Sequence, residues 1–153
     1  MALNNEFLVK RVQKFTYNVD EHGGTFNTAI EIGRLPANAL IVGGYAKVTT
    51  AITDSDDGND TTISLGYTGA ATAFLAATAC SDLTDNAVFT LLPGQAALGV
   101  DAAHDTAVEV AALVAASYIN LTAEKSVLVT ISNSATNIDT GKMDIFIEYV
   151  ISE

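Results

Sequence analysis

The chain has 153 residues, 49% of them hydrophobic, and a formal net charge of −11. This length fits a single domain that buries about 70% of its unfolded surface, and no apolar run approaches the roughly 20 residues that a bilayer span requires. The acidic balance argues against nucleic acid and anionic membranes as partners, because both attract clustered Lys and Arg.

Residues 7–19 (FLVKRVQKFTYNV) are the first predicted element, either a first strand or an extended arm. They hold the only basic cluster of a chain whose residues 51–153 carry two basic groups against fourteen acidic ones. We therefore expect this segment to dock on an acidic neighbour, such as the next subunit, through Phe7, Val9, Lys10, Arg11, Lys14, Phe15 and Tyr17. The alternative is a solvated edge strand whose lysines oppose aggregation.

A second strand is predicted at 25–33, and residues 40–67 predict a β-hairpin. The run LIVGGYAKVTTAIT alternates as a half-buried strand does, with one face formed by Ala46, Val48, Thr50 and Ile52. The loop DSDDGND separates it from the run TTISLGY, and the Asp57-Gly58 pair suits a turn with positive φ. Gly43-Gly44 near the start of the hairpin suggests a bulge or bend.

The middle of the chain is rich in alanine and its pattern is less decisive. We expect a short helix at 70–79 with Thr68 as its N-cap, a short strand at 88–94, and an extended piece with a loop at 95–105. Residues 106–124 predict two short strands, although their alanine content would equally permit a helix.

Two further strands are predicted at 126–132 and 143–152. One face of the last strand carries Met143, Ile145, Ile147, Tyr149 and Ile151. The opposite face is also partly apolar, which suits a central strand or a subunit interface. We therefore expect these five residues to form the core or an oligomer seam.

Together these elements predict an all-β fold, an antiparallel β-sandwich or jelly roll of about eight strands with an N-terminal arm. Residues 1–19 would form the arm or first strand, and residues 20–153 a single β-sandwich domain.

No catalytic pattern accompanies these strands. The acidic loop offers Asp54, Asp56, Asp57 and Asp60 as weak candidates for Ca²⁺, but the EF-hand positions for Gly and Glu hold Asn59 and Leu65. His22 and His104 lie beside no nucleophile motif, and the single Cys80 excludes an intrachain disulfide and a multi-cysteine zinc site. We expect no metal, no cofactor and no enzymatic activity.

The stretch LPANALIVGGYAKVTTAITDSDDGNDTTISLGYTGAATAFLAATAC resembles a pattern of small tailed-bacteriophage virion proteins. In that pattern a V-x-V-x-T-A strand, a polar turn, a TLSIG-like strand and an F-L-A-A-T motif follow one another, and residues 46–51, 61–66 and 74–78 correspond. The ending GKMDIFIEYVI resembles the G-x-v-x-v-x-v-x-Y ending of the same proteins. Tyr67-Thr68-Gly69 stands where those proteins place an Asp.

The resemblance implies a virion structural protein similar to jelly-roll capsid cement (decoration) proteins. Such a protein would be a homotrimer on the outer capsid surface, bound to the major capsid protein and made in the host cytoplasm. Two alternatives stay open: another virion component, such as a tail, neck or fibre-head protein, and a carbohydrate- or Ca²⁺-binding β-sandwich module.

Overall fold

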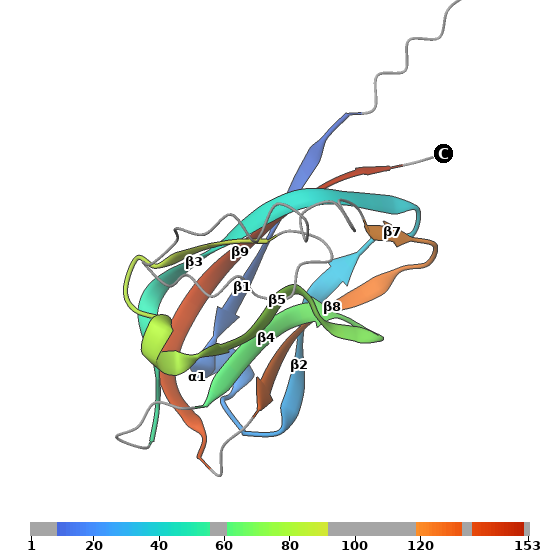
Figure 1. The fold of residues 1–153 in the computed structure, drawn as a ribbon. Coiled ribbons are helices and arrows are strands. Elements are labelled where there is room, and N and C mark those ends of the chain that lie inside the picture. Colours follow the sequence, from blue (N-terminus) through green and yellow to red (C-terminus); the bar gives the residue numbers. More distant parts are fainter. Residues whose placement is uncertain (1–8, 56–60, 92–118, 133–135, 152–153) are drawn as a thin grey trace, which may run out of the picture.

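A computed structural model of the chain describes residues 9–55, 61–91, 119–132 and 136–151 (Figure 1). Within these ranges it has nine strands and two helical turns: β1 (Arg11–Asn18), α1 (Val19–His22), β2 (Thr28–Leu35), β3 (Ala39–Asp54), β4 (Thr62–Tyr67), β5 (Ala70–Ala79), η1 (Cys80–Asp82), β6 (Val88–Thr90), β7 (Ile119–Leu121), β8 (Lys125–Ser132) and β9 (Ile138–Ile151). No helix in these ranges is long and apolar enough to cross a membrane.

The strands form two antiparallel sheets. Sheet A has the order β1-β9-β3-β6, with β7 also paired to β3, and sheet B has the order β2-β8-β4-β5. Figure 1 shows sheet B lying in front of sheet A, so that the two sheets form two layers. The predicted all-β antiparallel sandwich is confirmed.

Side chains from the inner faces of both sheets form one hydrophobic core. The packing is close enough that a Cβ on Gly33 of sheet B would lie 2.6 Å from the ring of Phe15 in sheet A. Gly33 also has a φ of 153°, a backbone conformation that other residues rarely adopt. The ring of Phe15 therefore packs directly on the backbone of the opposite sheet, which holds the two layers together.

The predicted hairpin at 40–67 is wrong. Both of its strands exist as β3 and β4, but β3 belongs to sheet A and β4 to sheet B. One edge of β3 pairs with β9, and the other edge pairs with β7 and β6. The segment before β6 occupies the rest of that second edge, where Ile52 N–H donates to Leu83 O (3.0 Å). No edge of β3 is left for β4, so the chain crosses between the sheets instead of turning back.

Buried polar groups hold the start and end of this crossing. The Asp54 carboxylate accepts a hydrogen bond from Thr61 N–H (3.0 Å), and Thr61 O accepts one from Cys80 N–H (2.9 Å). Asp54 and Thr61 are both buried. These bonds give partners to the N–H and C=O groups of Thr61 and to the N–H group of Cys80, which have no strand partner at the crossing. Backbone groups can be buried only when they have such partners.

The predicted helix at 70–79 is also wrong, because these residues form β5. Its true neighbour is β4, and the two make a tight hairpin in which Tyr67 pairs with Ala70 and Gly69 has a φ of 100°. Burial of Phe74 and Leu75 in the core stabilises the strand. Tertiary pairing thus overrides the helical preference of alanine.

Other predictions agree with the structure. The strands expected at 25–33, 126–132 and 143–152 correspond to β2, β8 and β9, and the register of β3 against β9 shifts between Ile41 and Gly43, as expected of a bulge there. The first predicted element is a strand over residues 11–18, paired with β9. Residues 95–105 and 106–118 lie outside the described residues.

Two substitutions on opposite faces of β1 test whether this strand is part of the sandwich. Phe15 is 5% exposed and Val12 is 57% exposed. Phe15→Ala is expected to lower the free energy of unfolding by about 3–5 kcal/mol because it leaves a core cavity. The matched control Val12→Ala should change it by about 0.5 kcal/mol or less. Urea denaturation measures both, and equal effects of the two substitutions would contradict this packing.

Cys80 is expected to be unreactive in the folded protein. Its side chain is buried, and burial together with the neighbouring Asp54 carboxylate raises the pKa of its thiol to about 12. Because the thiolate is the reactive form, a chromogenic disulfide reagent at about pH 8 should modify Cys80 only after denaturant is added. Stoichiometric modification of the native protein within minutes would show that the thiol is accessible.

Candidate interaction face

The outer surface of sheet A is formed by the residues that alternate with the buried ones and point away from sheet B. We call this surface the sheet A face. It comprises Lys10, which precedes β1; Val12, Lys14 and Thr16 of β1; Lys142, Asp144, Phe146, Glu148 and Val150 of β9; Leu40, Tyr45 and Lys47 of β3; and Val88 and Thr90 of β6.

An aromatic pair lies in the middle of the sheet A face. Tyr45 of β3 and Phe146 of β9 are directly paired across the strands, and their rings stack with centroids 4.7 Å apart and an interplanar angle of 20°. Lys14 of β1, which pairs with Phe146 from the other side, places its Nζ 5.6 Å from the centre of that ring. Tyr45 remains 41% exposed, so a large aromatic surface faces outward.

Two ion pairs join β1 to β9 on the same face. Lys14 Nζ lies 2.8 Å from Asp144 Oδ2, and Lys10 Nζ lies 3.0 Å from Glu148 Oε2. Thr16 Oγ1 also donates to Asp144 Oδ1 (2.8 Å). Burial alone would raise the pKa of Asp144, but the hydrogen bonds from Lys14 and Thr16 and the charges of Lys14 and Lys142 outweigh it and leave this pKa lowered.

In both pairs the lysine is the outer partner. The Lys10 and Lys14 side chains are 57% and 52% exposed, whereas Glu148 and Asp144 are 31% and 18% exposed. Lys47 and Lys142 are exposed as well. The lysines therefore cover the carboxylates, and the outermost charge of the sheet A face is positive.

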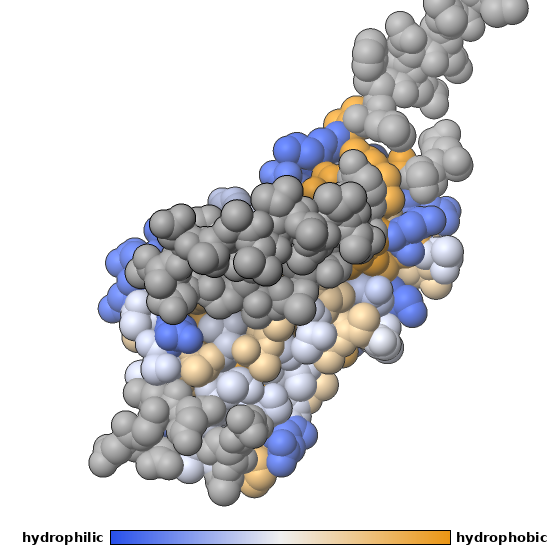
Figure 2. Space-filling model, viewed as in Figure 1, coloured by the Kyte–Doolittle hydropathy of each residue, from blue (hydrophilic) through white to orange (hydrophobic). Residues whose placement is uncertain are grey.

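Exposed apolar side chains surround these groups. Val12 and Val88 are 57% and 54% exposed, and Val9, just before β1, is 69% exposed. Figure 2, viewed from the side of sheet B, shows that hydrophobic residues also gather at the end of the molecule where β1 begins and β9 ends, beside hydrophilic ones. This combination of an apolar surface with a polar rim is typical of protein interaction sites.

The structure places the predicted partner-binding residues in two groups. Val9, Lys10, Arg11 and Lys14 are exposed at the start of β1 or on the sheet A face. Phe15 and Tyr17 are buried, and their assignment to a docking surface is corrected, because alternation along β1 turns them into the core. Tyr17 Oη donates to Gly23 O inside the fold (2.9 Å). Phe7 lies outside the described residues.

The predicted oligomer seam is corrected in the same way. Met143, Ile145, Ile147 and Tyr149 are each at most 7% exposed in the single chain, and Ile151 is partly buried against the same core. Strand β9 is central in sheet A, and sheet B already covers this side of it. These residues form the core, which was the other role expected of them.

Only one of the four metal-ligand candidates of the acidic loop lies among the described residues. Of its four candidates, Asp54 is buried at the crossing between the sheets, and Asp56, Asp57 and Asp60 lie outside the described residues. Within the described ranges no cluster of three or more His, Cys, Asp or Glu side chains could hold a metal ion. His22 interacts with the backbone of Asn18, and His104 lies outside the described residues.

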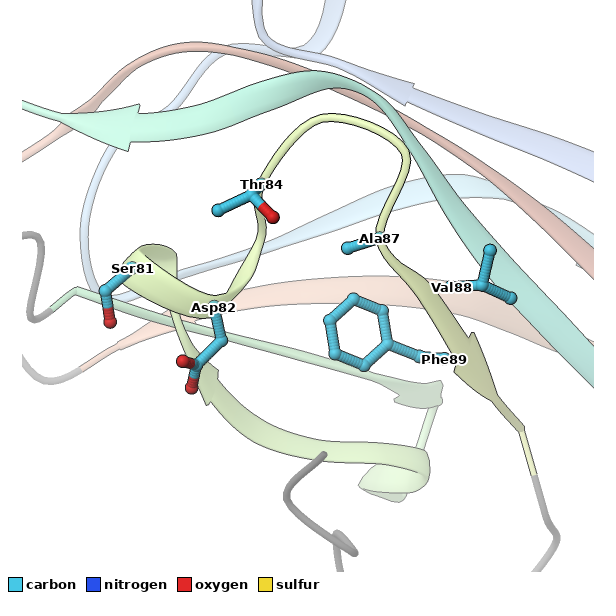
Figure 3. Close-up of a pocket in the computed structure, with 6 residues that line it drawn as sticks. All are labelled: Ser81, Asp82, Thr84, Ala87, Val88 and Phe89. Atoms are coloured by element: carbon cyan, nitrogen blue, oxygen red, sulfur yellow. The ribbon is translucent and has the colours of Figure 1, made fainter. Parts of the chain in front are cut away.

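A hollow of about 300 Å³ lies beside β6, lined by Ser81, Asp82, Thr84, Ala87, Val88 and Phe89. Figure 3 shows the Phe89 ring pointing toward Thr84 and Asp82, while Val88 lies on the other side of the strand. The lining supplies one carboxylate and two hydroxyls. We find in this set no pairing of a nucleophile with a base of the kind that acyl transfer requires.

The sequence alone did not single out four residues of the sheet A face: Tyr45, Lys47, Lys142 and Phe146. Tyr45 and Lys47 alternate with the buried face of their strand, and Phe146 with that of the last strand, so each could be assigned to an outer face. That they share one surface follows only from the pairing of β3 with β9.

No protein-family model and no curated protein matches this chain. Three solved structures contain a similar chain. One from the cyanophage Pam1 capsid asymmetric unit aligns with a TM-score of 0.64 and 15% identity, over 99% of this chain and 92% of that chain. One from the acid-stable capsid of Helicobacter pylori bacteriophage KHP30 has a TM-score of 0.58 and 15% identity, over 95% and 90%. One from the capsid of Ralstonia phage GP4 has a TM-score of 0.60 and 16% identity, over 95% and 86%. This chain thus shares its fold with chains of phage capsid structures.

The lowered pKa of Asp144 predicts a pH-dependent contribution to stability. A carboxyl whose folded-state pKa is depressed stabilises the fold above its unfolded pKa and loses this effect as the pH falls through the folded value. Asp144→Asn should therefore cost up to about 1 kcal/mol at neutral pH, as expected of a partly exposed ion pair. The difference from wild type should shrink as the pH falls below about 4, the pKa of an unperturbed Asp, and through the lower folded-state pKa. Urea denaturation across this range tests it, and a cost independent of pH would contradict the assignment.

Proposed function

We propose that this chain is a capsid cement (decoration) protein of a tailed bacteriophage, which stabilises the head shell by binding between major capsid proteins on its outer surface. The observation that carries this proposal is the similarity in fold to chains of three phage capsid structures, over 95% or more of this chain. The sequence resemblance to virion proteins at residues 46–51, 61–66 and 74–78 supports the same role.

The mechanism is burial of protein surface, without catalysis or a cofactor. A β-sandwich with a close-packed core is a rigid body whose surface side chains keep their positions. Repetition over a symmetric shell multiplies a modest affinity at each site, because neighbouring contacts act together. A homo-oligomer, with a trimer as the expected state, would match the three-fold positions of such a shell.

The exposed start of β1 fits this role. Val9, Lys10 and Arg11 are exposed at the end of the sandwich where Figure 2 shows hydrophobic residues. Phe7 precedes them in the sequence. We therefore keep these residues as partner-binding candidates and leave out Phe15 and Tyr17, which serve the core.

Copy number in the virion tests the proposal. A cement protein occupies a site repeated over the whole shell, so quantitative mass spectrometry of purified virions should find hundreds of copies of this chain, in a constant ratio to the major capsid protein. Shells lacking the chain should also dissociate at a lower temperature and regain stability when purified chain is added. About a dozen copies would instead indicate a neck or tail component, and absence from virions would remove the proposal.

A further inference from the structure

We propose that the sheet A face is the surface through which this chain docks, and that its partner is a protein surface with an apolar centre and carboxylates around it. This inference rests on the proposed function, which places the partner in the capsid shell. It goes further by assigning the contact to one face of one sheet and by stating the chemistry of the surface opposite.

Charge is distributed very unevenly between this face and the rest of the chain. Four of the seven basic residues, Lys10, Lys14, Lys47 and Lys142, lie on the sheet A face with two carboxylates, for a local charge of +2. Outside this face the described residues hold three basic groups and eight carboxylates, for a charge of −5. An acidic partner is attracted to this face and repelled by the rest of the described surface, so electrostatics orient the encounter.

The charged groups are arranged to present their positive ends. Asp144 and Glu148 lie beneath Lys14 and Lys10, and Asp144 is held by Thr16 as well. Away from this face, Arg34 is paired with both Glu31 (2.8 Å) and Glu124 (3.0 Å), so its charge is offset locally. The sheet A face is thus the main positive surface of the described chain.

The centre of the face supplies the apolar contact. The stacked rings of Tyr45 and Phe146 are held by adjacent strands of one sheet, with exposed Val12 and Val88 on the outer strands to either side. Aromatic residues that are already fixed in place lose little entropy on binding, and they dominate the energy of many interfaces. Tyr45 also offers a hydroxyl for a hydrogen bond at the edge of the contact.

The same features disfavour a second copy of the chain as the symmetric occupant. A two-fold contact through this face would set lysines against lysines, because both partners present the same patch. Nucleic acid is disfavoured too, since a local charge of +2 is small against the net charge of −11 of the whole chain.

The test uses purified full-length chain and shells of its own phage that lack it, with binding measured by co-sedimentation. Tyr45→Ala removes half of the aromatic pair and should weaken binding about tenfold or more. Lys47→Gln should weaken it about threefold and reduce its sensitivity to salt. The matched controls are Phe26→Ala, an aromatic residue 36% exposed outside the face, and Lys125→Gln, which removes the same charge from β8 of sheet B. Both controls should bind as wild type does.

A second measurement uses only the wild-type chain, so it does not depend on whether a variant folds. Lysine acetylation followed by mass spectrometry compares free and shell-bound protein. Lys10, Lys14, Lys47 and Lys142 should be protected on the shell, and Lys125 should be modified equally in both states.

The outcomes separate this inference from the proposed function. If the wild-type chain does not bind shells, the proposed function fails and this inference fails with it. If it binds but the four variants bind alike, or the protected lysine is Lys125, the docking face is elsewhere while the function stands. If Tyr45→Ala dissociates an oligomer of the chain in sedimentation velocity and leaves shell binding intact, the face is occupied by a second copy, which overturns the proposal.

Discussion

The pairing of β3 with β9 is the interaction on which the rest of the structure depends. It joins residues 39–54 to residues 138–151 and forms the centre of sheet A, with β1 on one side and β6 and β7 on the other. The two strands approach closely at Gly44, where a Cβ would collide with the backbone oxygen of Phe146 and the φ is 151°. A side chain there would push the strands apart and shift every contact that the register sets.

This register determines both faces of the sheet at once. Ala46 opposite Ile145 faces the core, and Tyr45 opposite Phe146 faces outward. Since successive side chains of a strand point to opposite sides, burial of one set in the core holds the other set in place. The rigidity of the sheet A face is therefore a consequence of core packing.

Long-range pairing also explains which sequence predictions failed. Period-2 alternation correctly located the strands around Ala46 and Ile145, and it assigned Met143, Ile145 and Ile147 to one face. It did not identify the partner of β3, because both edges of that strand are taken by segments far away in the sequence. The alanine-rich β5 was mistaken for a helix since its strand conformation depends on β4 and on the burial of Phe74 and Leu75.

For the interaction face, Lys10 and Lys14 stood out as a basic cluster, whereas Lys47 and Lys142 are isolated in the sequence and join them only across the sheet.

The sequence by itself determined the fold class and, for most residues of β3 and β9, which side chains point inward, because both follow from local alternation of apolar and polar side chains. It also determined that the chain is acidic apart from one basic segment. Only the tertiary structure decided which strands pair, that Phe15 and Tyr17 serve the core, and that an aromatic pair and four lysines share one surface. The physical reason is that backbone hydrogen-bonding groups are the same at every residue, so a strand's partner is selected by the packing of the whole core.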